Sequence, residues 1–110
     1  MEISTKEFKR VVVVEIKGRI DSAAAPEFES ALKELTEAGR KKLILDMMGV
    51  EFLASAALRV MVTARKVVQE GGGDLVIAQP SQRVTDTLDI AGLDVLFTTY
   101  PDRESAIGSY

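Results

Sequence analysis

Residues 43–66 of the chain, LILDMMGVEFLASAALRVMVTARK, predict a buried strand, a tight connection and a helix. The strand is predicted from a compact apolar run, residues 43–45, that ends at Asp46 and has the length of a central strand. Ser55 stands where an N-cap residue is expected, because its hydroxyl can accept a hydrogen bond from an unpaired amide of the first helical turn. This position places Ser55 at the surface. The predicted buried face of the helix consists of Ala57, Val60, Met61, Ala64, Val67 and Val68.

The rest of the chain alternates strands and helices around this unit. The predicted strands are residues 3–8, 11–17, 43–46, 75–78 and 96–99, the last an edge strand. The predicted helices begin between Ser22 and Pro26, at Ser55, near Ser81 and at Pro101, and the first three end at Gly39, Gly71 and Gly92. Ser22 and Ser81 are interpreted as helix caps. This ββαβαβαβα order predicts an α/β fold in one domain, residues 1–110. Its mixed sheet is mostly parallel after an N-terminal antiparallel hairpin, with helices packed against it.

Composition narrows the possible chemistry. The chain contains no cysteine and no histidine, which removes disulfides, thiolate nucleophiles, most zinc sites and histidine-based triads. A formal net charge of −3 argues against a nucleic-acid partner, and the one cationic run, Arg40-Lys41-Lys42, is typical of a solvated loop. No uncharged run approaches the ~20 residues that span a bilayer, and no leader segment is apparent. We therefore expect a cytoplasmic protein without a metal, a cofactor or a membrane partner.

Two short segments resemble a known family. VEFLASAALRVM, residues 50–61, resembles the signature segment of the STAS domains of bacterial anti-sigma factor antagonists, and the segment Gly18–Asp21 is similar to their GxLD element. The resemblance implies a STAS-like fold and a regulatory role without catalysis. It also implies that the chain binds a kinase-like anti-sigma factor, that this serine kinase phosphorylates Ser55, and that phosphorylation switches binding off. A phosphatase would then reverse the switch.

The predicted sheet brings the implied partner surface together at one end. Ligands and partners usually meet the carboxyl ends of parallel strands, so Asp21, Ser22, Ser55 and residues 46–53 should lie close together. The residues predicted to contact the partner are Asp21, Ser22, Ala23, Phe52, Leu53, Ala54, Ala56, Leu58 and Arg59. Gly18 and Asp46 are assigned structural roles, Asp46 as a turn-former or cap.

The chain departs from the family pattern at two positions. Ala54 stands where many members have aspartate or serine, and Ala57 stands where most have glycine. The methyl group of Ala57 is expected to narrow the space that the backbone of a partner could use. These departures favour an alternative in which the domain is a non-phosphorylated scaffold or a small-ligand or nucleotide-binding module. The expected oligomeric state is a monomer or a weak dimer.

A hydrolase with Ser55 as nucleophile, supported by Asp21 or Asp46, is the weakest hypothesis. An aspartate alone activates a hydroxyl poorly, and no histidine is present to act as the base. Lys66 would lie roughly 16 Å along the helix at 1.5 Å per residue, too far away to replace it. We therefore expect no enzymatic activity.

Overall fold

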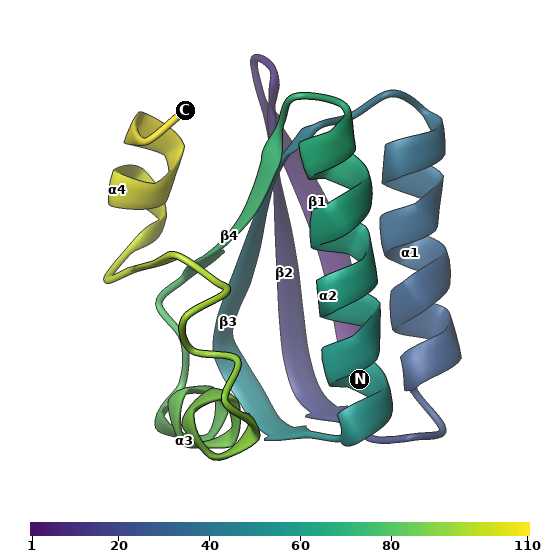
Figure 1. The fold of residues 1–110 in the computed structure, drawn as a ribbon, viewed down its shortest axis with the longest axis vertical. Coiled ribbons are helices and arrows are strands. Elements are labelled where there is room, and N and C mark those ends of the chain that lie inside the picture. Colours follow the sequence, from purple (N-terminus) through teal and green to yellow (C-terminus); the bar gives the residue numbers. More distant parts are fainter.

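The computed structural model describes residues 1–110 and confirms the predicted order of strands and helices (Figure 1). The strands are β1 (Glu2–Phe8), β2 (Val11–Ile20), β3 (Lys42–Leu53), β4 (Asp74–Ala78) and β5 (Thr99–Tyr100). The helices are α1 (Ala25–Glu37), α2 (Ser55–Glu70), α3 (Gln82–Ala91) and α4 (Arg103–Gly108). The sheet order is β1-β2-β3-β4-β5, with β1 antiparallel to β2 and every other pair parallel, so the predicted fold class is confirmed.

The sheet is covered on both faces, and this explains the apolar runs in its central strands. In β2, Val12, Val14 and Ile16 point to the face covered by α1, α2 and α3, where the main core of 22 buried residues lies. Val11 and Val13 point to the other face, which only α4 and its neighbours cover. Figure 1 shows α1 and α2 side by side, with α4 standing apart from them. Strands buried on both faces cannot alternate apolar and polar residues, which is why β2 begins with four valines.

Three predicted strand ranges are wrong by more than one residue. β2 was expected to end at residue 17 but continues to Ile20. β3 was expected to end at Asp46 but continues to Leu53, because Met47, Val50 and Leu53 still bury side chains in the main core. The final strand was expected over residues 96–99 but covers only Thr99–Tyr100, since Phe97 packs into the core from a turn rather than from the sheet. The predicted position of this strand at the sheet edge is confirmed.

The helix ends follow the local chemistry in most places. Ser81 is the N-cap of α3, and its hydroxyl accepts from the Val84 amide at 3.2 Å, as predicted. Gly39 and Gly92 adopt left-handed conformations (φ +83° and +72°) where α1 and α3 end, also as predicted. Ser22 is not a cap: α1 begins three residues later, at Ala25, after a turn. None of the four helices has the length and apolar composition needed to cross a bilayer.

The chain end closes the second face of the sheet. The Tyr110 hydroxyl has one proton to donate and lies 2.9 Å from the carbonyl oxygen of Leu43 and 2.7 Å from that of Asp74. Burial of this hydroxyl, followed by the nearby charge of Asp74, raises the pKa of Tyr110 above its usual range. Tyr110 therefore remains protonated at neutral pH and fastens the end of the chain to β3 and β4.

Gly73 allows β4 to begin beside β3. A Cβ atom at this position would lie 2.0 Å from the carbonyl oxygen of Lys41, and that oxygen also accepts from the Asp74 amide at 3.0 Å. Gly73→Ala must push the two strands apart, so we expect a loss of about 1–3 kcal/mol in the free energy of unfolding. Thermal denaturation should show a fall in Tm of at least ~4 °C.

The matched control is Gly108→Ala, because a Cβ atom at Gly108 would have no atom within 4 Å apart from its chain neighbours and the backbone of its own helix. This change should leave Tm unchanged or raise it slightly, since alanine favours a helix more than glycine does. Equal Tm values for the two variants would contradict the role assigned to Gly73.

Candidate functional site

The pairing of β2 with β3 brings two distant loops together at one end of the sheet. Ile20 pairs with Leu53 at the last position of the two strands, and the Ala54 amide donates to the carbonyl oxygen of Ile20 at 2.9 Å. The segment Asp21–Ala23 therefore leaves β2 beside the start of α2, as predicted. Figure 1 shows the first turns of α1 and α2 at this same end of the sheet. We call the exposed and half-buried residues of 21–23 and 52–59 the Ser55 surface.

Ser55 is the first residue of α2, and its side chain is exposed. The prediction that it is the N-cap is wrong by one residue: Ala54 holds the extended cap conformation (φ −78°, ψ 162°) and has no side chain to offer a hydrogen bond. The Ser55 hydroxyl is therefore not engaged in capping. The first amides of α2 lack intrahelical partners, so the hydroxyl stands beside free N–H groups and the positive end of the helix dipole.

Arg59 adds a cation to this environment. It lies four residues after Ser55, on the same face of α2, and it is exposed and outside all of the ion pairs in the chain. No acidic residue occupies the first turn of α2. The helix start is thus electrostatically suited to a negative charge on Ser55.

Asp21 shapes the loop beside Ser55 rather than offering a free carboxylate. Its Oδ1 accepts from the Ala24 amide at 2.9 Å, and its backbone carbonyl accepts from the amides of Ala24 and Ala25 at 3.1 and 2.9 Å. These bonds fix the turn that precedes α1 and leave Ser22 and Ala23 exposed.

Gly18 explains how β2 reaches this loop. Its φ of +92° falls in a region that side chains disfavour, and the register between β2 and β3 shifts between Gly18 and Arg19. Beyond the shift, the guanidinium of Arg19 lies 4.5 Å from the centre of the Phe52 ring. This stacking fixes the half-buried Phe52 at the edge of the Ser55 surface.

The predicted contact residues divide into exposed and buried groups. Ser22, Ala23 and Arg59 are exposed, and Asp21, Phe52, Ala54 and Ala56 are half-buried. Leu53 and Leu58 are only 4 % and 9 % exposed and belong to the main core, so a docked partner reaches little of either side chain. Ala57 is fully buried as well. Its methyl group packs inward and does not narrow the surface.

Asp46 was expected beside Ser55, but it lies elsewhere. It is in the middle of β3, 2 % exposed, and its side chain points to the α4 face of the sheet. Arg103 of α4 pairs with Asp46 and donates at 2.6 Å to Glu15, the neighbour of Asp46 in the sheet. The Gln79 side-chain amide donates to both Asp46 carboxylate oxygens at 3.0 and 3.2 Å. Asp46 therefore anchors α4 and has no part in the Ser55 surface.

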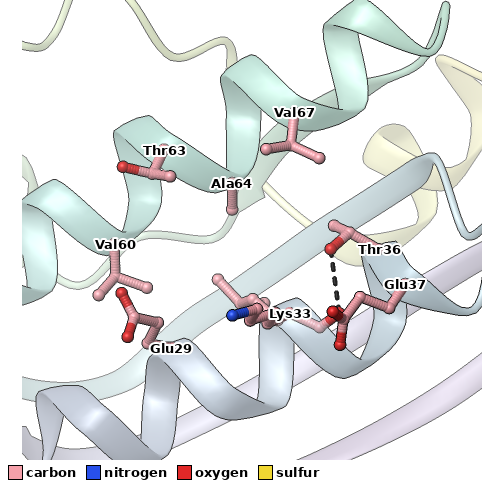
Figure 2. A pocket seen from close by; sticks show the side chains of 9 residues that line it. Glu29, Lys33, Thr36, Glu37, Val60, Thr63, Ala64 and Val67 are labelled. Carbon is pink, nitrogen blue, oxygen red and sulfur yellow. Dashed lines mark hydrogen bonds between the residues drawn. The ribbon is translucent and has the colours of Figure 1, made fainter.

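A groove between α1 and α2 was not predicted. It has a volume of about 360 Å³, and Figure 2 shows α2 side chains facing α1 side chains across it. Val67 was assigned to the buried face but is 47 % exposed and lines this groove. The apolar residues of α2 form a wider stripe than α1 and the sheet cover, so Val67 at the edge of the stripe stays exposed. The residues that line the groove are Glu29, Leu32, Lys33, Thr36, Glu37, Val60, Thr63, Ala64 and Val67.

Comparisons with known proteins identify the family and the fold. The family model for the STAS domain matches residues 2–106. The anti-sigma-B factor antagonist of Bacillus subtilis is 31 % identical over 93 residues, which cover 84 % of each chain. An anti-sigma factor antagonist from Mycobacterium paratuberculosis superimposes with a TM-score of 0.88 at 24 % identity, over 98 % of this chain and 92 % of that one. The Bacillus cell fate determinant SpoIIAA, solved in its phosphorylated form, gives a TM-score of 0.78 at 16 % identity over 98 % of both chains.

The missing cap at Ala54 gives a direct test of the helix start. In Ala54→Ser, the new hydroxyl can accept from an unpaired amide of the first turn, which stabilises a helix by about 1 kcal/mol. Thermal denaturation should show Tm higher by roughly 4–8 °C. Ala56→Ser is the control, because the same side chain placed inside the first turn cannot cap it. If the two variants had equal Tm values, Ala54 would not be the N-cap.

Proposed function

The chain belongs to the STAS domain family, and from this we propose that it is an anti-sigma factor antagonist controlled by phosphorylation of Ser55. The family consists of regulators without enzymatic activity. In the proposed cycle, the unmodified chain binds a kinase-like anti-sigma factor in the cytoplasm and frees a sigma factor for transcription. The anti-sigma factor phosphorylates Ser55 and thereby ends the association, and a phosphatase restores it.

The observation that carries the proposal is the unengaged, exposed hydroxyl of Ser55 at the start of α2. A kinase needs a hydroxyl that it can reach without unfolding its substrate. A hydroxyl that capped the helix would accept a hydrogen bond from a backbone amide, whereas the Ser55 hydroxyl does not. The relatives support the partner class, since the Bacillus subtilis protein is an anti-sigma-B factor antagonist.

Energetics favour a switch that acts on binding rather than on folding. A phosphate adds close to two negative charges beside the helix start, where the dipole favours them by ~0.3–1 kcal/mol. Arg59, one turn along the same face, can pair with the phosphate. The folded chain should therefore tolerate the modification easily.

The same charge is costly at an interface. Burying a dianion against a partner without a matching cation costs several kcal/mol. A phosphate that pairs with Arg59 also removes a cation that the partner could otherwise contact. Since every 1.4 kcal/mol changes affinity about tenfold, the loss of binding should be at least a hundredfold.

We propose that the partner covers both parts of the Ser55 surface. The segment Asp21–Ala23 is fixed by the Asp21 hydrogen bonds, and Phe52 is held by Arg19. The start of α2 is held in place by the side chains of Leu53, Ala57 and Leu58, which are buried in the main core. A rigid surface of this kind loses little conformational entropy on binding.

The test combines modification, affinity and stability. Incubation with the cognate anti-sigma factor kinase and ATP should add one phosphate, seen by intact mass spectrometry. The phosphorylated chain should bind the anti-sigma factor at least ~100-fold more weakly, measured by calorimetry. Its Tm should stay within a few degrees of the unmodified chain, because the phosphate is well tolerated by the helix start.

Ser55→Ala is the control: it should accept no phosphate and should keep its affinity when kinase and ATP are present. A phosphate that still appears in Ser55→Ala would place the modification on another residue. A large change in Tm with unchanged affinity would show that Ser55 controls folding rather than association.

A further inference from the structure

Cationic side chains from two distant segments converge at the end of the sheet opposite Ser55. Val11, the first residue of β2, pairs with Lys42, the first residue of β3, so the β1–β2 turn meets the loop between α1 and β3. A hollow of about 310 Å³ lies between them, and no acidic or apolar side chain lines it. We call its five cationic residues the basic pole; they are Lys9, Arg10, Arg40, Lys41 and Lys42. Only Arg40 is neutralised, by Glu7, although the whole chain carries a net charge of −3.

Helix termini account for part of this cluster. α1 ends just before the hollow, and the side chain of Lys41 lies against Gly71 at the end of α2. Cations near helix C-termini interact favourably with the dipole, which is a structural reason for Arg40 and Lys41. This reason does not apply to Lys9 and Arg10, which form the turn between two strands.

Lys9 is also an unfavourable choice for the turn. Its φ of +59° lies in the left-handed region, where glycine or asparagine is more stable than lysine. A strained residue that contributes charge to a hollow indicates a role beyond the turn itself. The solvated-loop interpretation of Arg40-Lys41-Lys42 therefore leaves the basic pole unexplained.

A second, apolar hollow adjoins the first. It has a volume of about 680 Å³ and shares Lys9, Arg10 and Lys42 with the cationic hollow. Its other walls are apolar or aromatic, and Phe8 among them is 41 % exposed. These walls are Phe8, Val11, Ile107 and Tyr110. The cationic hollow and the apolar hollow are therefore adjacent, and Lys9, Arg10 and Lys42 line both of them.

We propose that the basic pole is a docking site for an acidic segment of another protein that carries an aromatic or large apolar side chain. The spaced carboxylates would pair with Lys9, Arg10 and Lys42, and the apolar side chain would enter the hollow beside Phe8 and Tyr110. Aromatic and arginine residues around a pocket are typical of strong protein–protein contacts.

A compact phosphate group fits this pole less well. Sites for such groups use backbone amides at helix N-termini, whereas α1, α2 and α4 direct their C-terminal ends toward this pole. A free phosphate would also leave the apolar hollow empty. A bilayer surface would take up protruding apolar side chains, not fill a hollow.

The site is independent of the Ser55 surface, because the two lie at opposite ends of β2 and β3. Binding at the basic pole should therefore be unaffected by Ser55→Asp. This independence separates a failure of this proposal from a failure of the proposed phosphorylation switch.

The experiment uses a fluorescent synthetic peptide rich in aspartate and glutamate with one central tryptophan, and measures anisotropy with the full chain. The double variant Lys9→Gly/Arg10→Ser removes two cations, and glycine at position 9 relieves the strained turn, so its Tm should not fall. The peptide should bind this variant roughly tenfold more weakly, because each exposed ion pair contributes a few-fold. Binding should also weaken in Phe8→Ser and when salt is raised.

Arg83→Ser is the matched control, because Arg83 is exposed on α3 and forms no ion pair. It should bind the peptide as the unmodified chain does, and a peptide with serine in place of tryptophan should bind more weakly. Equal losses in Arg83→Ser and the double variant would overturn the proposal. The proposal would also be overturned if tripolyphosphate or anionic phospholipid vesicles bound at Lys9 and Arg10 and the peptide did not.

Discussion

The parallel pairing of β2 with β3 is the constraint on which both proposed binding surfaces of the molecule depend. The two strands run together from Val11 and Lys42 at one end to Ile20 and Leu53 at the other. At the carboxyl end, this register places Asp21 beside the start of α2 and leaves the Ser55 hydroxyl exposed. At the amino end, the same register joins the β1–β2 turn to the loop before β3. A shift of one strand by one residue would turn its side chains to the opposite face of the sheet and would separate the residues that now meet at both ends.

Packing on the two faces of the sheet is unequal, and the proposed phosphorylation site lies outside the main core. The main core lies under α1, α2 and α3 and includes Leu53, Ala57 and Leu58 directly around Ser55. These residues hold the start of α2 in place while Ser55 stays outside the packed region. On the other face, a small cluster and the Arg103–Asp46 ion pair hold α4. A charge added to Ser55 therefore meets a rigid helix start and no part of the core.

The sequence was sufficient for the fold class because its strongest patterns are local. The helical period after Ser55 and the apolar runs of β2 and β4 predicted the element order and the mixed sheet. Asp46 was misjudged because its partner is 57 residues away, in a helix whose contact with the sheet no local pattern reveals. A buried carboxylate in mid-strand looks like the end of the strand until that arginine is known. The end of β3 was therefore placed too early.

The details of the site depended on equally non-local facts. Ala54 is the N-cap against its own propensity, because the hydrogen bond from its amide to Ile20 fixes the chain there. Its neighbour Ser55 was the obvious candidate from residue type alone. The basic pole escaped prediction because Lys9 and Lys42 meet only through the register of β2 and β3.

A partner is proposed to cover the carboxyl end of this strand pair. Hydrogen exchange of the complex with the anti-sigma factor tests it most directly: protection should appear at residues 21–23 and 52–59. Protection confined to α3, α4 or the β1–β2 turn would contradict it.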